Sequence, residues 1–317
     1  MSSCPHLLNK GISLSGRPII GVSSCLLGEP VRYNGGHTKK EWITSILSNF
    51  VDLVPICPEI EMGLGVPRRP IEIMGNQNIK SLVQIETKND ITELANKTFK
   101  NILPHQNLNG FILMSKSPSC GVNNAKLFNA TTDSLIKYTQ GFFTSFLNTE
   151  LPLIPLISSS KINNKQSRDH FLRILFAHFN FSELDGNLDE LKLFHKKYEF
   201  ILNEHTENKL GTIIQNTNRD NVSIIYQNYF SSFIKAIKQP PTKRNRVKSF
   251  KIIYIQIKEK LTYLDKKYFK YIINSYRSGK ISYINIISEL QFMDNKYKLE
   301  IDKTYLFCPF PYDLSNS

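Results

Sequence analysis

Three cysteines of this chain share one local pattern: each follows an apolar run and lies in a turn that contains glycine or proline. They are Cys25, Cys57 and Cys120, which follow the runs 19–24, 50–56 and 110–114. Short apolar runs bounded by turn residues are typical of buried strands. A fold for this chain must therefore place a cysteine just beyond the ends of three different strands.

The first half of the chain alternates between strand and helix patterns. The expected strands are 18–24, 51–56, 81–85, 110–115 and 151–157, and the expected helices are 39–49, 91–103 and 140–147. Such alternation predicts an α/β fold with a parallel, doubly wound, Rossmann-like sheet. Ligands bind at the carboxyl ends of the strands in such sheets, so we expect the three cysteines to converge there.

The second half of the chain has the apolar spacing of helices and few glycines, which predicts an all-α region. The expected helices are 168–179, 188–202, 206–216, 223–238, 250–261, 266–278 and 284–297. A chain of 317 residues suits two domains. We predict a loose extension at 1–17, an α/β catalytic domain at 18–160 and an all-helical domain at 161–317.

Positive charge is concentrated in the helical half. Residues 161–317 hold 26 Lys and Arg against 16 Asp and Glu, whereas residues 1–160 hold 14 against 11. The excess predicts a polyanionic partner, either nucleic acid or an anionic membrane surface, although an AT-rich genome would also enrich lysine. The densest cluster surrounds two prolines between expected helices, where a solvated loop is the alternative for any single residue. Its members, our candidates for nucleic-acid contact, are Lys235, Lys238, Lys243, Arg244, Arg246, Lys248 and Lys251.

Neither a secretory leader nor a membrane span is expected. Residues 1–17 lack the apolar stretch of a signal peptide, and no run reaches the roughly 18 apolar residues of a span. We expect a cytoplasmic protein that does not enter a membrane, and the sequence predicts no oligomeric state. In a reducing compartment, widely spaced cysteines are more often metal ligands, nucleophiles or small core residues than disulfides.

Three converging cysteines leave one position open around a four-coordinate centre. They suit zinc with a water as its fourth ligand, or three irons of a cubane cluster whose fourth iron acts as a Lewis acid. Glycine and proline beside each cysteine favour a backbone that wraps a bulky centre. The alternative is three small buried side chains at strand ends, since free cysteine is commonly buried.

Polar residues near these cysteines are suited to proton transfer and substrate contact. Glu59 follows Cys57 by two residues and is a candidate general base, or else a helix N-cap or a surface acid. Ser117 is either catalytic or a turn hydroxyl that binds the backbone. Arg32 and Arg68 would contact phosphate, or would pair with the nearby acids Glu61 or Glu72.

A set of motifs in the first half carries a family resemblance. In order, they are Cys25-Leu26-Leu27-Gly28, Val31-Arg32-Tyr33-Asn34-Gly35-Gly36, Cys57-Pro58-Glu59, Gly63-Leu64, Pro67-Arg68 and Ser117-Pro118-Ser119-Cys120-Gly121. This set resembles the thiouracil desulfidase family over residues 17–160. The second half resembles, more loosely, the YbgA-like domain that is often fused to it. Its motifs include Leu193-Phe194-His195, Tyr276-Arg277 and Lys303-Thr304-Tyr305-Leu306, although Glu199 stands where that family usually has a lysine.

The resemblance implies an iron–sulfur enzyme. The three matched cysteines would hold a [4Fe-4S] cluster whose fourth iron binds the thiocarbonyl sulfur, and water would replace that sulfur without net electron transfer. Glu59 matches the catalytic glutamate and Ser117 the catalytic serine, while Ser119 is the alternative serine. Together with Ser119, Arg32 and Arg68 are candidates for substrate binding.

Fused proteins of this kind resemble tRNA 4-thiouridine desulfidases, so thiolated tRNA is the expected substrate, giving uridine and hydrogen sulfide. A buried base would have to leave its stack to reach such a site. Two alternatives remain: a desulfidase of free thiouracil or thiouridine, and a nucleic-acid-binding protein with a structural metal centre.

Overall fold

The computed structural model describes residues 16–315 except for 77–78, 103–106, 206–209 and 216–221. Most of the expected extension at 1–17 thus lies outside the described residues. The chain forms two compact units, Gly16–Leu175 and Phe176–Tyr312. The division falls inside helix α4 (Lys165–Ser182), whereas the sequence predicts a boundary after residue 160. Within the described residues, no helix has the length and apolar character needed to cross a membrane.

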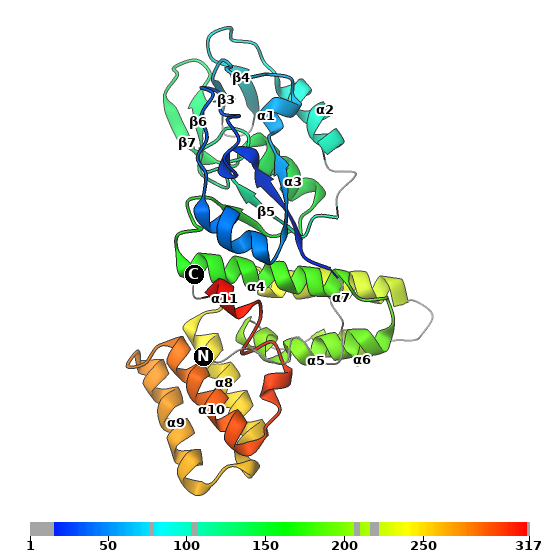
Figure 1. The fold of residues 1–317 in the computed structure, drawn as a ribbon, viewed down its shortest axis with the longest axis vertical. Coiled ribbons are helices and arrows are strands. Elements are labelled where there is room, and N and C mark those ends of the chain that lie inside the picture. The colour runs from blue at the N-terminus through cyan, green and yellow to red at the C-terminus, as the bar shows by residue number, and fades with distance from the viewer. Residues whose placement is uncertain (1–15, 77–78, 103–106, 206–209, 216–221, 316–317) are drawn as a thin grey trace. The chain divides into compact units, whose positions relative to one another are not determined.

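A parallel sheet forms the centre of the N-terminal unit (Figure 1). Its strand order is β2-β1-β5-β8, and all neighbouring strands run parallel. The strands are β2 (Asp52–Ile56), β1 (Ile19–Ser23), β5 (Gly110–Leu113) and β8 (Leu156–Ser158). The middle strands β1 and β5 are buried almost throughout, as continuous apolar runs in a parallel sheet should be. The expected Rossmann-like parallel sheet is therefore confirmed.

A second sheet of mixed direction belongs to the same unit. Its order is β4-β3-β6-β7, where β3 and β6 are parallel and the outer pairs are antiparallel. The strands are β4 (Lys80–Gln84), β3 (Ile71–Gly75), β6 (Ala125–Asn129) and β7 (Leu135–Thr139). Each of these strands has five residues, and the sequence predicts only β4, because the other three owe their state to pairing within the sheet rather than to a clear pattern of their own. Ile73, Leu82 and Leu127 are fully buried in the core that the second sheet shares with the first.

Helices cover the parallel sheet and complete this core. They are α1 (Pro58–Glu61), α2 (Thr92–Ile102) and α3 (Phe142–Glu150), with the short turns η2 (Ser24–Leu26), η3 (Trp42–Ile46) and η4 (Leu47–Asn49). Phe143 of α3 packs edge-on against Phe99 of α2 and Phe111 of β5, with ring centroids 5.2 and 6.2 Å apart. This edge-to-face geometry is favourable for buried rings and fixes both helices against the sheet.

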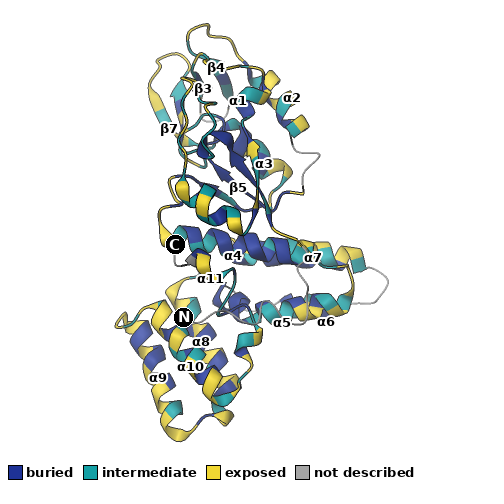
Figure 2. Cartoon of the chain, in the orientation of Figure 1, coloured by how far each residue is buried: buried dark blue, intermediate teal, exposed yellow. Residues whose placement is uncertain are grey.

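The second unit is helical, as expected. Its longer helices are α5 (Leu188–His205), α6 (Leu210–Gln215), α7 (Val222–Ile237), α8 (Lys243–Ile257), α9 (Tyr263–Ser278) and α10 (Tyr283–Tyr297). Shorter segments are η6 (Lys258–Lys260), η7 (Ile301–Lys303) and α11 (Tyr312–Ser315), whose last residues group with the N-terminal unit. Figure 2 shows alternating buried and exposed residues along these helices, the pattern of amphipathic helices packed around a core.

The basic segment at residues 243–248 is helical, so the expectation that it lies between two helices is wrong. Thr242 caps α8, because its hydroxyl accepts the backbone N–H of Asn245 at 3.2 Å. The two preceding prolines cannot continue a helix, whereas a threonine is a favourable cap. The expected helix at 250–261 thus begins seven residues earlier, at Lys243.

Candidate active site

The three cysteines follow the three adjacent strands at one side of the parallel sheet. Cys25 lies in η2 directly after β1, Cys57 precedes α1 directly after β2, and Cys120 lies in the turn region after β5. Ser23 of β1 pairs with Ile56 of β2, so these two strands end at the same level. The cysteines therefore lie at the carboxyl edge of the sheet, as the strand pattern predicts.

The three thiols share one electrostatic environment with Glu59. Burial raises the pKa of Cys25 to about 11, and burial also raises the pKa of Cys57 and of Cys120. The negative charges of Glu59 and Cys57 raise the pKa of both Cys25 and Cys120 further. Because buried thiolates that repel one another are costly, these groups stay protonated until a cation compensates for their charge.

Neighbouring polar groups lower the pKa of each cysteine and partly offset the effect of burial. They are the side chain of Ser23 for Cys120, the side chain of Thr38 for Cys25, and the backbone N–H groups of Ile60 and Glu59 for Cys57. The Thr38 hydroxyl also donates to Sδ of Met114 at 3.4 Å. Such donors stabilise the thiolate, the form that binds metal. Hydrogen bonds to sulfur are a usual feature around iron–sulfur clusters.

Among the described residues, no group of three His, Cys, Asp or Glu side chains is arranged to hold a single metal ion. A single zinc ion draws its thiolates to about 2.3 Å from one point. A cubane cluster holds its thiolates at separate corners and therefore needs wider spacing. Two buried thiols and one half-buried thiol, each beside a polar group that lowers its pKa, fit the soft donor set of a cluster.

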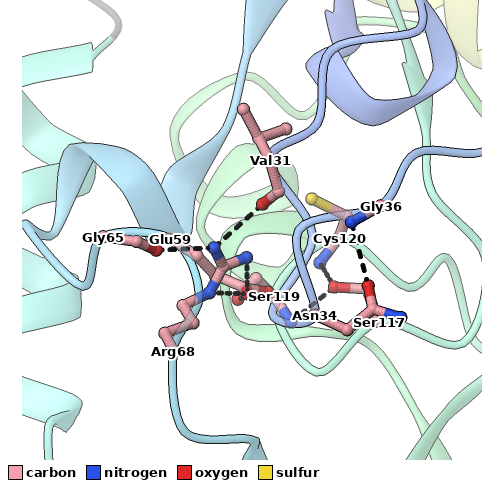
Figure 3. Close-up of polar contacts among 9 residues, drawn as sticks. All are labelled: Val31, Asn34, Gly36, Glu59, Gly65, Arg68, Ser117, Ser119 and Cys120. Atoms are coloured by element: carbon pink, nitrogen blue, oxygen red, sulfur yellow. Dashed lines mark hydrogen bonds and ion pairs between the residues drawn. The ribbon is translucent and has the colours of Figure 1, made fainter.

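Arg68 holds the carboxylate of Glu59 (Figure 3). Its Nε donates to Oε2 of Glu59 at 2.8 Å, and its Nη2 donates to the same oxygen. Its Nη1 donates to the carbonyls of Val31 at 2.8 Å and Gly65 at 3.0 Å. The side chains of Arg68 and Glu59 are only 4% and 14% exposed, so this is a buried ion pair. The partner of Arg68 is thus neither of the two acids that the sequence suggested.

The two serines of the cysteine turn make different contacts (Figure 3). Ser119 is fully buried, and its Oγ donates to Oε1 of Glu59 at 3.1 Å. Ser117 is half-buried, and its Oγ accepts the backbone N–H groups of Ser119 at 3.1 Å and Cys120 at 3.0 Å. Ser119 therefore orients Glu59. Ser117 shapes the turn that carries Cys120 and keeps its own O–H available to donate.

Backbone packing fixes the turn that carries Cys120. A Cβ at Gly121 would lie 2.7 Å from the carbonyl oxygen of Ser117, which is too close for any side chain. On the other side, Thr144 of α3 donates its hydroxyl to the carbonyl of Cys120 at 2.9 Å. Because both contacts involve the backbone, the position of Cys120 is set by the fold rather than by its own side chain.

Arg32 lies close to the thiols. Its positive charge lowers the pKa of Cys25, and its guanidinium is 5.8 Å from the ring centroid of Tyr33. Tyr33 is exposed, and its carbonyl accepts the backbone N–H of Arg68 at 2.9 Å. The turn after Cys25 thus brings a cation and an exposed aromatic ring beside the sulfur site.

The seven basic candidates lie in the helical unit, and six of them are exposed. Arg246 differs, because its side chain is only 20% exposed and its guanidinium lies 4.0 Å from the ring centroid of Tyr283. Its Nε is 4.0 Å from Glu204, which accepts a hydrogen bond of 2.6 Å from the Tyr283 hydroxyl. Arg246 is therefore part of the packing between α5, α8 and α10.

Two residues at the site, Ser23 and Thr38, carry no sequence signal that would single them out. Ser23 is the last residue of β1, and its Oγ also accepts the backbone N–H of Met114 at 2.9 Å. Thr38 lies in the loop after Cys25, and the carbonyl of Cys25 accepts its backbone N–H at 2.8 Å. Their contacts depend on how neighbouring strands and loops come together, which local sequence does not encode.

Comparison with known proteins covers both halves of the chain. Residues 20–158 match the 2-thiouracil desulfurase family, and residues 197–311 match a family described as a protein of unknown function, DUF1722. The chain is 35% identical over 121 residues to the uncharacterized protein YbbK of Bacillus subtilis (strain 168), spanning 36% of this chain and 78% of that protein. A solved structure, the [4Fe-4S]-dependent thiouracil desulfidase TudS, is 28% identical and aligns over 46% of this chain and 93% of its own, with a TM-score of 0.38.

The family matches agree with the resemblance that the motifs suggest in each half. The matched region 20–158 contains all three strand-end cysteines together with Glu59 and Arg68. The chain therefore belongs to the 2-thiouracil desulfurase family and carries a DUF1722 domain in its helical half.

Proposed function

We propose that this chain is a desulfidase that removes sulfur from thiolated uracil, and that its substrate is 4-thiouridine in tRNA. One observation carries the proposal. Glu59, whose side chain is only 14% exposed, is fixed between Arg68 and Ser119 and shares its electrostatic environment with two buried thiols, Cys25 and Cys120, and the half-buried thiol of Cys57. A closed structural metal centre would not require an oriented proton acceptor at its side.

Cys25, Cys57 and Cys120 would hold a [4Fe-4S] cluster through three of its irons. The bound cluster would supply a Lewis-acidic iron with an open position, which suits a soft thiocarbonyl sulfur. The raised pKa values of the thiols agree with this role, because a cationic centre would stabilise their ionised forms. Binding would thus release protons and depend on pH.

Glu59 would move the protons of the reaction. The net change replaces the sulfur of C=S with the oxygen of water and releases hydrogen sulfide, so carbon keeps its oxidation state and no electron donor is needed. Glu59 would accept one proton when water attacks and a second from the resulting hydroxyl as the C=O bond forms, and would pass both in turn to the sulfur as the C–S bond breaks, so that it leaves as hydrogen sulfide. Arg68 holds one carboxylate oxygen and Ser119 holds the other, so the carboxylate stays in one orientation.

The remaining polar groups would bind the substrate ring. Ser117 has a free O–H to donate to the charge that develops on the pyrimidine. Arg32 supplies a positive charge near Cys25, and the exposed ring of Tyr33 offers a surface for stacking. Arg68 is committed to Glu59, so we assign it to positioning rather than to direct substrate contact.

The positive charge of the helical half supports tRNA over a free base as the substrate. A free pyrimidine needs only a small pocket, whereas a nucleotide within RNA brings phosphates that bind Lys and Arg. The name of the matched family, 2-thiouracil desulfurase, favours the second candidate, which is a desulfidase of free thiouracil.

An anaerobic turnover experiment tests both candidates. The full chain would be reconstituted with iron and sulfide and mixed with thiolated tRNA, and separately with free 4-thiouracil. We expect tRNA to lose its thiouridine absorbance and release sulfide. Turnover of the free base alone would support the second candidate, and no turnover of either by protein with bound iron would refute both.

Variants separate the roles of the site residues. Cys120→Ala should lose both bound iron and activity, whereas Glu59→Gln should keep its iron and lose activity. Ser119→Ala should keep its iron and lower kcat by roughly 10- to 100-fold, the usual loss when a supporting hydrogen bond is removed. Full activity of Glu59→Gln would contradict the assignment of Glu59 to proton transfer.

A further inference from the structure

The positive charge of the helical unit lies almost entirely in one pair of helices. Residues 243–278, which form α8, η6 and α9, contain eleven Lys and Arg against two Asp and Glu. The other residues of 161–317 contain fifteen against fourteen and are nearly neutral. A net charge of +9 within 36 residues is far from an even distribution, so the partner of this unit should be sought at α8 and α9.

These two helices are joined by a short connection and pack together through their apolar faces (Figure 1). Phe250 and Ile253 of α8 and Phe269 and Ile273 of α9 belong to one buried cluster. The cations lie on the faces that remain, because a buried helix face is apolar. The pair therefore presents a positive surface on a rigid base.

Two aromatic rings of α9 are more than 60% exposed. Tyr263 is 69% exposed and Tyr271 is 64% exposed, and Lys267 lies between them in sequence. The spacing of four residues from each to the next places all three on one face of α9, and Lys267 is exposed as well. Lys267 Nζ lies 4.6 Å from the ring centroid of Tyr263. We call these three residues the α9 stripe.

We propose that the α9 stripe binds RNA, with its tyrosines stacked on unpaired bases and the surrounding cations bound to phosphates. Alternating aromatic and basic residues on a positive face are the features that bind single-stranded nucleic acid. Bases in loops expose the ring faces that stacking requires, whereas duplex RNA hides them. A protein partner would need an acidic surface whose negative charge matches this positive charge. A surface that bound phosphates alone would need only lysines and arginines and would not require exposed tyrosines.

The inference rests on the proposed function only for the identity of the RNA as tRNA. It also moves the main contact away from part of the set that the sequence suggested. Arg246 is held against Tyr283 and Glu204, so it does not belong to the RNA surface. The exposed residues Lys248 and Lys251 of α8 lie within the charged pair and remain phosphate contacts.

The test measures tRNA binding by the full chain, using fluorescence anisotropy over a range of salt concentrations. Tyr263→Ala and Tyr271→Ala should each weaken binding roughly 5- to 150-fold without changing the salt dependence, because stacking is not ionic. Lys267→Ala should reduce the slope of log K against log salt concentration by about one, the value expected for the loss of one phosphate contact. A paired RNA duplex without loops should bind equally to wild type and to the tyrosine variants.

Two matched variants serve as controls. Tyr268→Ala removes a less exposed tyrosine of the same helix, whose pKa is raised by burial and by the neighbouring Glu289, and Lys192→Ala removes an exposed lysine of α5 that pairs with Asp189 at 2.9 Å. Both should bind tRNA like wild type. Unchanged RNA binding by the stripe variants would overturn the proposal. It would also be overturned if these variants kept their RNA binding and lost self-association, because the stripe would then be a contact between copies of the chain.

Turnover measurements on the same variants test the desulfidase proposal separately. Turnover of free 4-thiouracil should be the same in the stripe variants and in wild type, because the stripe contains no residue of the cysteine site. If the stripe variants bind tRNA like wild type and desulfurate thiolated tRNA normally, the RNA-binding role of the stripe is rejected and the desulfidase proposal stands. If the stripe variants lose RNA binding and the wild-type protein desulfurates neither substrate, the RNA-binding role of the stripe stands and the desulfidase proposal is rejected.

Discussion

Replacing Arg68 with methionine should destabilise the N-terminal unit strongly. The change leaves the carboxylate of Glu59, which is 14% exposed, without its cation, and leaves the carbonyls of Val31 and Gly65 without a donor. Removing one partner of a buried ion pair costs about 3–5 kcal/mol, which is roughly a 100-fold or larger change in the folding equilibrium. Urea unfolding followed by the fluorescence of Trp42, the single tryptophan, reports on this unit in the metal-free full chain.

The neighbouring residue provides the control. Arg69 pairs with Glu86 at 3.3 Å, but both side chains are more than half exposed, so Arg69→Met should cost about 0–1 kcal/mol. A double-mutant cycle of Arg68→Met with Glu59→Gln should recover part of the loss, because the unpaired charge is then gone. Equal destabilisation by the two arginine substitutions would refute the argument that burial makes the Arg68 pair important.

Two further predictions concern other parts of the fold. Burial lowers the pKa of His178 from 6.5 to about 4, so the unfolded chain binds a proton that the folded chain does not, and stability should fall as the pH drops from 6.5 towards 4. Circular dichroism melts at pH 7, 5.5 and 4.5 should show a smaller loss in His178→Phe, and equal losses would contradict this. In Gly121→Ala the new methyl meets the Ser117 carbonyl, which should destabilise the N-terminal unit by about 1–3 kcal/mol and reduce bound iron. If this variant unfolds in urea like wild type, as followed by Trp42 fluorescence, and binds the same amount of iron, the turn can adapt and the prediction is wrong.

Much of the fold could be predicted from the sequence because its main signals are local. Apolar runs followed by a turn and a cysteine indicate β1, β2 and β5, and helical spacing indicates α7, α9 and α10. The second sheet was largely missed, since β6 and β7 owe their state to pairing with each other and with β3 rather than to a clear pattern of their own. The pattern of the basic segment before Val247 predicts a connection between two helices, because its charge hides the cap that Thr242 supplies.

The candidate site divides in the same way. The sequence identified the cysteines, Glu59, the two serines and Arg68, but it could not assign a partner to any of them. Arg68 reaches Glu59 across nine residues, and Ser119 reaches it across sixty. Contacts of this kind depend on where loops from separate strands meet.

By itself, the sequence determined which residues carry soft sulfur and positive charge, and that three strands would bring the cysteines to one edge, because those properties follow from residue type and spacing. Only the tertiary structure decided which serine holds Glu59, that Arg68 is its buried partner and that Arg246 packs inside the helical unit. The physical reason is that hydrogen bonds and ion pairs require both partners within about 3 Å, and burial then sets their strength. Both quantities belong to the packed chain rather than to any one segment of it.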